Sequence, residues 1–166
     1  MSRDEIREIA EIVGGDKTYV HFVHRINKEF DASDENRNSN VYVLFQEDDN
    51  GDKIGFCVIG DSPVKMRIWE KTFKDEEWVD KDFVMGAPSY ELMYMYIKPE
   101  HRGKGHGDKL FTRAMDFAKD KNVKAVYSYV SDRSPTGLEF YRRMNANILQ
   151  DFSDEESSTA FLEWKL

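Results

Sequence analysis

Residues 91–107 read ELMYMYIKPEHRGKGHG, and this stretch is the most informative in the chain. A strand-like run ends at Pro99 and is followed by a glycine-rich loop that opens an amphipathic helix. The first backbone N–H groups of a helix lack intrahelical partners and carry a partial positive charge. Glycines in front of them let an anion approach closely. The stretch therefore predicts a cradle for a phosphate group.

Two common phosphate-binding loops do not match this stretch. The P-loop requires Gly-x-x-x-x-Gly-Lys followed by Ser or Thr, and no window around residues 103–108 supplies it. The dinucleotide fingerprint Gly-x-Gly-x-x-Gly also fails, because Asp108 holds the position of the last glycine when the count starts at Gly103. A nucleotide-phosphate enzyme of either kind is therefore disfavoured.

The pattern that does fit is Arg102-x-x-Gly105-x-Gly107. It resembles the pyrophosphate loop, Gln/Arg-x-x-Gly-x-Gly/Ala, of the GNAT acetyltransferase superfamily. It also follows a strand with that family's apolar-x-Pro ending, here residues 97–99. The resemblance begins near Val41, runs to the C-terminus and is specific between residues 91 and 144.

The resemblance implies a mixed α/β (α+β) GNAT fold, built as one acetyltransferase domain over residues 1–166. Its central sheet is expected to be twisted, mostly antiparallel, flanked by helices and splayed at the acyl-CoA site. Such sheets normally begin with a strand, but two helices open this chain. The sheet is therefore expected to be one strand short or to borrow a strand from residues 64–86.

The resemblance also implies acetyl-CoA as cosubstrate and assigns residues to it. The backbone of Met95, Tyr96 and Ile97 is expected to pair with the pantetheine arm. The remaining cofactor residues are expected at the pyrophosphate loop and at the position of a frequent family asparagine; they are Arg102, Gly103, Lys104, Gly105, His106, Gly107 and Ser134. No metal ligand set is expected, because His21 and His24 have no third partner in the sequence.

Two residues are candidates for proton transfer. Tyr141 occupies the position of the family's tyrosine, which faces the CoA sulfur and protonates the departing thiolate; the alternative is a half-buried packing role beside Phe140. Glu91 is the best base in reach, because it shares a strand face with Met95 and Ile97. The family usually uses such a glutamate through water, and the alternative is an exposed charge at a strand edge.

Composition narrows the choice of partner. The 166 residues contain 24 Lys and Arg against 32 Asp and Glu, for a formal charge of −8. The electrostatic field of such a charge repels nucleic acid and anionic membranes and attracts cations. The alternative is that the excess of acidic residues only makes the protein more soluble. We therefore predict a primary amine on a small cationic or polar acceptor. Cys57 is the only cysteine, and no leader or membrane span is visible, so a cytoplasmic location is expected.

The pattern of apolar residues predicts the remaining elements except one. A hairpin is expected over residues 41–59, with its turn at Asn50-Gly51. Residues 62–88 are open between a helix that starts at Pro63 and a strand, because Val64, Met66 and Ile68 alternate with charges. Four aromatic residues in this segment line either a substrate pocket or the core; they are Trp69, Phe73, Trp78 and Phe83.

A second class of function stays open beside the enzyme. A GNAT-like acyl-CoA-binding module or sensor without turnover needs the same loop but neither an acid nor a base. The presence of Tyr141 favours the enzyme. The oligomeric state is also open, a homodimer included.

Overall fold

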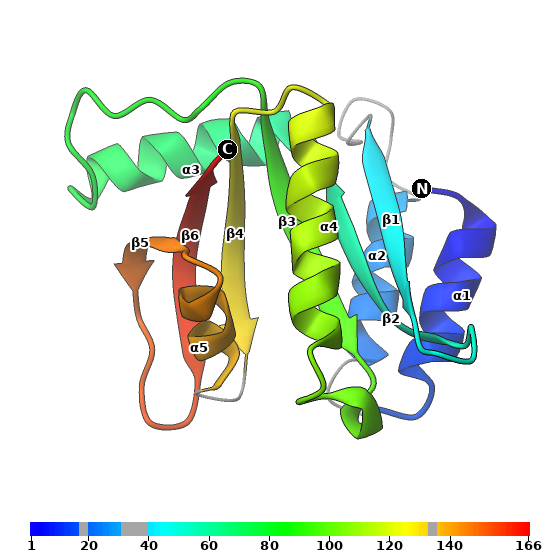
Figure 1. Cartoon of the computed structure of the whole chain (residues 1–166). Coiled ribbons are helices and arrows are strands. Elements are labelled where there is room, and N and C mark those ends of the chain that lie inside the picture. Colours follow the sequence, from blue (N-terminus) through cyan, green and yellow to red (C-terminus); the bar gives the residue numbers. More distant parts are fainter. Residues whose placement is uncertain (17–19, 31–39, 133–135) are drawn as a thin grey trace. The chain divides into compact units, whose positions relative to one another are not determined.

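The computed structural model describes residues 1–16, 20–30, 40–132 and 136–166, and Figure 1 traces its helices and strands. It divides into two compact units. The first unit contains Met1–Asp61 and Tyr94–Ala114, and the second unit contains Ser62–Met93 and Met115–Leu166. In chain order the elements are α1 (Arg3–Val13), α2 (Val20–Phe30), β1 (Val41–Glu47), β2 (Lys53–Gly60), α3 (Pro63–Asp75), β3 (Ser89–Ile97), the 3₁₀ turn η1 (Pro99–His101), α4 (His106–Asp120), β4 (Ala125–Asp132), α5 (Thr136–Arg143), β5 (Asn147–Asp151) and β6 (Ser158–Lys165).

The first unit opens with helix α1, whose ends follow from local sequence. Ser2 and Glu5 form a capping box, in which the Glu5 amide donates to the Ser2 hydroxyl at 3.2 Å and the Ser2 amide donates to the Glu5 carboxylate at 2.6 Å. Gly14, with φ of +54°, ends the helix. The buried face of α1 consists of Ile6, Ile9, Ile12 and Val13.

The strands β1 and β2 form the predicted hairpin. They pair antiparallel along their whole length, and the turn contains Gly51 with φ of +85°. The end of β3 is tied to this hairpin, because the Lys98 amide donates to the Ile54 carbonyl at 2.8 Å. The strand that leads into the glycine-rich loop is therefore fixed to a strand of the same unit that is almost fully buried.

The second unit contains the first part of β3 together with β4, β5 and β6. Ser89–Glu91 of β3 pairs parallel with Ala125–Tyr127 of β4. The β4–β6 and β5–β6 pairs are antiparallel. The hydrogen-bonded strand neighbours follow the order β1-β2-β3-β4-β6-β5, and the residues of β3 are divided between the two units. The parallel pair is the one joined through helix α4, as a strand–helix–strand sequence predicts.

Residues 62–88, which the sequence leaves open, contain helix α3 and no strand. Pro63 stands at the start of the helix, where its fixed φ suits the first turn. Met66 is 7% exposed, whereas Val64 and Ile68 are 43% and 58% exposed. The alternating pattern therefore reflects one inward and two outward positions on a helix. The expectation that the sheet borrows a strand from residues 64–86 is wrong, and among the described residues no strand precedes β1.

The aromatic residues of this segment cover the core of the second unit. Phe73 is fully buried in a cluster with Met66, Met85, Ala125 and Tyr127. Trp69, Trp78 and Phe83 pack against this cluster. All four residues thus take the predicted role in the core, and Phe83 also lines a cavity.

Within the ranges that the structure describes, no helix is long and apolar enough to span a membrane.

Candidate active site

The glycine-rich loop lies in the first unit, between η1 and helix α4. Gly103 has φ of +70° and Gly105 has φ of +80°, in the left-handed region that favours glycine. A Cβ atom built on either glycine meets no heavy atom within 4 Å. The Lys109 amide donates to the Gly105 carbonyl at 3.1 Å, so the helical hydrogen bonds begin at this glycine. The space beside both glycines is therefore open, and it lies in front of a helix N-terminus.

Arg102 ties this loop to the end of β3. Its Nε donates to the Ile97 carbonyl at 2.8 Å, and its guanidinium carbon lies 5.5 Å from the centre of the Tyr96 ring. Lys104 does the same for η1, because its Nζ donates to the Glu100 carbonyl at 2.8 Å. Both side chains thus make contacts that shape the loop.

Tyr96 has a structural environment that the sequence did not reveal. Its hydroxyl donates to the Asp16 carboxylate at 2.9 Å, and its ring stacks on Phe56 with centroids 5.7 Å apart. Burial, followed by the hydrogen bond to Asp16, raises the pKa of the Tyr96 phenol. The side chain anchors β3, which leaves the backbone of Met95–Ile97 as the feature predicted to meet a ligand.

His106 begins helix α4 and carries an unmatched polar atom. Its Nδ1 is buried and has no hydrogen-bond partner among the described residues. Its ring lies edge-on to that of His101, with centroids 6.2 Å apart. Buried polar atoms are normally paired, so this nitrogen at the start of the helix indicates a place where a ligand or water belongs.

Glu91 lies in the second unit, on β3, and is 5% exposed. Ser62 donates its hydroxyl to Oε2 at 2.5 Å, and Lys65 donates its Nζ to Oε1 at 2.8 Å. The alternative that Glu91 is an exposed charge at a strand edge is therefore wrong. Its role as a base stays a prediction.

Ser62 and Lys65 were not recognised from the sequence. Both stand at the start of α3, where Ser62 is the residue before the first turn. Their spacing of three residues places them on one helix face. A helix that starts at Pro63 would have indicated both residues. The alternation of apolar and charged residues in the same segment obscured that helix.

Tyr141 lies on α5 in the second unit and is half-buried. Its ring is edge-on to Phe140, with centroids 5.1 Å apart, and to Trp164, with centroids 5.6 Å apart. This packing matches the structural alternative, and it also fixes where the phenol points. The role of the hydroxyl as an acid stays a prediction.

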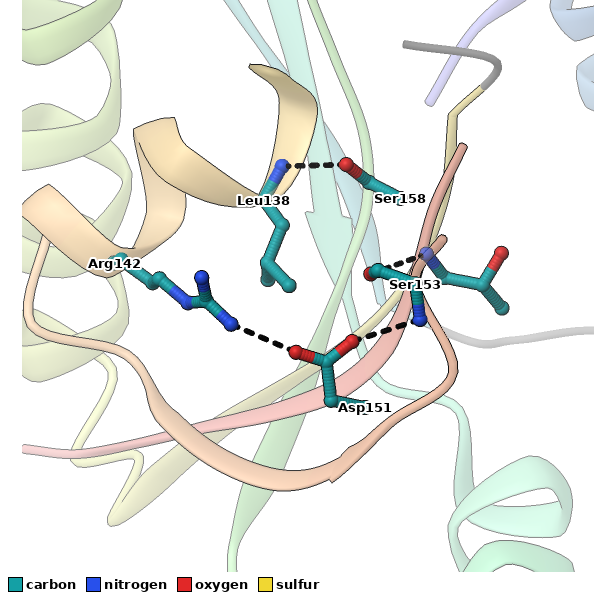
Figure 2. A network of polar contacts seen from close by, with 6 residues as sticks. Leu138, Arg142, Asp151, Ser153 and Ser158 are labelled. Carbon is teal, nitrogen blue, oxygen red and sulfur yellow. Dashed lines mark hydrogen bonds and ion pairs between the residues drawn. The ribbon is translucent and has the colours of Figure 1, made fainter. Parts of the chain in front are cut away.

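Helix α5 is held to β5 and β6 by polar contacts (Figure 2). The Leu138 amide donates to the Ser158 hydroxyl at 3.2 Å, and Arg142 forms an ion pair with Asp151 at 2.7 Å. Asp151 also accepts the Ser153 amide at 2.8 Å. The Ser153 hydroxyl and amide, with Arg142, lower the pKa of the Asp151 carboxyl. The element that carries Tyr141 is thus fixed at both ends.

The turn after α5 contains a residue with positive φ. Asn145 follows α5 and has φ of +58°. Asparagine tolerates this left-handed conformation better than most residues. The Trp164 indole donates to the Met144 carbonyl at 2.9 Å and closes the turn.

The predicted site residues thus fall into three groups. The first unit brings together Met95, Tyr96, Ile97, Arg102, Gly103, Lys104, Gly105, His106 and Gly107. The second unit contains Glu91 and Tyr141. Ser134 lies outside the described residues. Cys57 is fully buried, and burial raises the pKa of its thiol, so this thiol is a poor nucleophile.

Comparison with known proteins assigns the chain to a family. The model of the acetyltransferase (GNAT) family matches residues 6–146. The chain therefore belongs to the GNAT acetyltransferase family, whose members are N-acetyltransferases that use acetyl-CoA. The mixed α/β GNAT fold, with its mostly antiparallel sheet and flanking helices, is confirmed, and the splay of the sheet at the acyl-CoA site stays a prediction.

Individual relatives are distant. Thialysine N-epsilon-acetyltransferase of Bos taurus is 30% identical over 67 residues, which are 40% of this chain and 38% of the relative. A GNAT-family protein of Desulfovibrio desulfuricans has a similar fold, with a TM-score of 0.65 and 11% identity over 99% of this chain and 94% of that chain. Spermidine/spermine N-acetyltransferase SpeG of Vibrio cholerae gives a TM-score of 0.58 and 16% identity over 99% and 89% of the two chains.

A structure that contains coenzyme A is also similar. The PaiA N-acetyltransferase of Thermoplasma acidophilum, solved in complex with coenzyme A, gives a TM-score of 0.52 and 20% identity. The alignment covers 100% of this chain and 80% of that chain. At these identities the structural likeness concerns the fold alone.

Proposed function

We propose that this enzyme moves the acetyl group of acetyl-CoA to the primary amine of a small cationic or polar acceptor, by direct attack of the amine. The observation that carries the proposal is the open loop before α4. Gly103 and Gly105 both have positive φ, and both leave free the space that a side chain would fill. An anion at this place faces the backbone N–H groups of a helix start.

The residues present fit acetyl-CoA. The amides of residues 103–107 would hold the pyrophosphate, and the backbone of Met95–Ile97 would pair with the pantetheine arm. The unpaired Nδ1 of His106 at the same helix start supports a ligand there. When bound, acetyl-CoA supplies the thioester that the acceptor attacks.

Glu91 is the proposed acceptor of the amine proton. An amine with a lysine-like pKa of about 10.4 is protonated at neutral pH and must lose a proton before it attacks. Ser62 and Lys65 hold one oxygen each, which fixes the orientation of the Glu91 carboxylate. A carboxylate oxygen accepts more than one hydrogen bond, so an amine or a water molecule still has a lone pair to use.

Tyr141 is the proposed donor of a proton to the departing thiolate. Its ring is fixed by Phe140 and Trp164, and its helix is fixed through the Arg142–Asp151 ion pair. A phenol that is already held in the reactive orientation does not lose conformational entropy before it donates its proton.

The class of acceptor is proposed from charge and from relatives. The chain carries a formal charge of −8, which raises the rate of encounter with cations. Two similar proteins are named for amine substrates, spermidine/spermine and thialysine. Both lines support a basic amine rather than an anionic acceptor.

The proposal also covers the organisation of the chain. We infer one catalytic domain over residues 1–166, because β3 and α4 each run continuously through both units. A cytoplasmic location, and a reaction without a metal ion, nucleic acid or membrane, stay predictions from composition and sequence.

The test is turnover with pooled amines. The full chain is incubated with acetyl-CoA and with pools of polyamines, amino acid derivatives, aminoglycosides and basic peptides, while CoA thiol release is measured and products are weighed by mass spectrometry. We expect release with pools of small basic amines. Acetyl-CoA binding without release in any pool would instead support the acyl-CoA-binding module.

A further inference from the structure

The second unit contains a cavity of about 570 Å³ that the acetyl-transfer site does not use. Its walls come from the segment after α3 and from the ends of β4, β5 and β6. This volume lies within the range of small-molecule sites, about 300–1,000 Å³. The cavity is therefore large enough for a small ligand.

One wall of the cavity contains a buried carboxylate, that of Glu163, which is 2% exposed. Tyr127 donates its hydroxyl to Oε2 at 2.9 Å, and Asn147 donates its side-chain amide to Oε1 at 3.0 Å. The Tyr127 hydroxyl in turn accepts the Gly86 amide at 2.9 Å. The carboxylate is thus oriented by two neutral donors from neighbouring strands.

Little positive charge compensates the buried carboxylate of Glu163. Lys165 Nζ lies 3.9 Å from Oε1, but the Lys165 side chain is 80% exposed. A pair with one partner in solvent is strongly screened. A buried charge is unfavourable unless it is paired with an opposite charge. The site therefore favours a cation that enters the cavity.

The other walls indicate what kind of cation fits. Val79, Phe83, Val84 and Leu149 give the cavity apolar surface, which a bare metal ion does not need. At the mouth, the exposed Asp80 and Asp82 are balanced in number by the exposed Lys124 and Lys165. The innermost charge is thus negative, and the surface around it is apolar.

We propose that this cavity binds an organic ammonium ion, whose ammonium group donates to Glu163 while its apolar body contacts Phe83 and Leu149. This is a binding site in addition to the acetyl-transfer site, and it stands whether or not the acceptor class is right. Simple alkylamines and amino acids share this chemistry. Amino acids also have a carboxylate, which Lys124 and Lys165 at the mouth would attract, and simple alkylamines do not.

Butylamine is the first probe, with butanol and butyrate as matched neutral and anionic compounds. The side-chain amide of Asn147 donates to Glu163, so its NMR resonances report occupancy directly. In the full-length protein we expect saturable shifts of these resonances with butylamine and none with the other two. Absence of butylamine shifts at Asn147 up to 10 mM, about ten times the weakest dissociation constant of interest, overturns the proposal.

Two variants separate this cavity from other places where an amine binds. Glu163→Gln keeps the size of the side chain and removes its charge, so butylamine should bind at least tenfold more weakly. Glu91→Gln removes a different buried carboxylate of the same unit and should leave the Asn147 shifts unchanged. Undiminished binding to a folded Glu163→Gln protein contradicts the proposal, as does loss of the Asn147 shifts in a folded Glu91→Gln protein.

Norleucine distinguishes the two sources of the ammonium group. Tighter binding than butylamine means that Lys124 or Lys165 contacts its carboxylate and identifies an amino-acid site. Weaker binding identifies a site for simple amines. Both outcomes require Glu163, and a norleucine affinity that is equal in wild type and Glu163→Gln overturns the assignment.

Discussion

Gly105 controls what can lie against the start of α4. Its φ of +80° is one that side chains with a Cβ rarely adopt, and the space beside it is open. In Gly105→Val the branched side chain fills that space and strains the backbone. We expect acetyl-CoA to bind at least tenfold more weakly, as measured by titration of the folded variant.

A second glycine provides the control for backbone strain. Gly14 also has positive φ, +54°, but it ends α1 and has no predicted role in the loop. Gly14→Val should lower stability and leave acetyl-CoA affinity within about twofold of wild type. Wild-type affinity in Gly105→Val would show that the loop is a structural turn.

The proposed reaction depends on the hydroxyl group of Tyr141. Tyr141→Phe keeps the contacts of the ring with Phe140 and Trp164 and removes one oxygen. We expect kcat to fall by roughly 10²-fold or more, while acetyl-CoA affinity changes little. Tyr42→Phe, on β1, is the matched control and should keep its turnover. A Tyr141→Phe enzyme with wild-type kcat would leave this tyrosine as packing only.

At the scale of elements, helix α5 depends on a pH-sensitive contact. Asp151 accepts hydrogen bonds from Ser153 and pairs with Arg142 (Figure 2), and these partners lower its pKa. A carboxyl with a lower pKa in the folded state stabilises the protein above its unfolded-state value. This contribution disappears as pH falls through the folded-state value. Asp151 should therefore stabilise α5 at neutral pH and lose this effect below about pH 4.

Asp151→Asn tests this sign. Thermal unfolding should show a loss of about 0.2–1 kcal/mol at pH 7, because the pair is partly exposed. The difference from wild type should shrink as pH is lowered from 5 to 2. Glu155→Gln removes a charge in the same connection and should show a smaller loss. A difference that grows toward low pH would contradict the assignment.

Elements with local signals were predictable from the sequence, and those with tertiary causes were not. The hairpin over residues 41–59 and the loop at residues 102–107 follow from turn and glycine chemistry in a few adjacent residues. Helix α3 did not follow, because Val64 and Ile68 are apolar but exposed. Their positions imitate a strand, and only the packing of Met66 and Phe73 settles the period.

The candidate site divides in the same way. The glycine-rich loop before α4 was predictable, because its glycines are visible in the sequence and permit the positive φ that Gly103 and Gly105 adopt. The partners of Glu91 were not, because Ser62 and Lys65 lie 29 and 26 residues away in the chain. Contacts at that separation depend on how α3 packs on β3, which no local pattern records.

At the scale of the whole molecule, ligand binding is expected to raise stability. A ligand that binds only the folded state stabilises it by about 2.7 kcal/mol at a hundred times its dissociation constant. For a chain of 166 residues this corresponds to a rise in Tm on the order of 5–10 °C. We expect this rise with acetyl-CoA and a smaller one with adenosine nucleotides, by differential scanning fluorimetry. Equal shifts with both ligands, or none with acetyl-CoA, would reject the cofactor assignment.

The net charge of −8 leads to a prediction about the acceptor. Attraction between a cationic acceptor and an acidic protein is screened over about 10 Å at 0.1 M salt. The KM of cationic acceptors should therefore rise with ionic strength, by roughly two- to tenfold between 20 and 300 mM salt. The KM of neutral amines of similar size should change less. Because both acceptors use the same thioester, a change in acetyl-CoA binding would affect both, and the ratio of the two KM values isolates the electrostatic part. A best acceptor that is neutral or anionic, with salt-independent KM, would contradict the electrostatic argument and leave the family assignment intact.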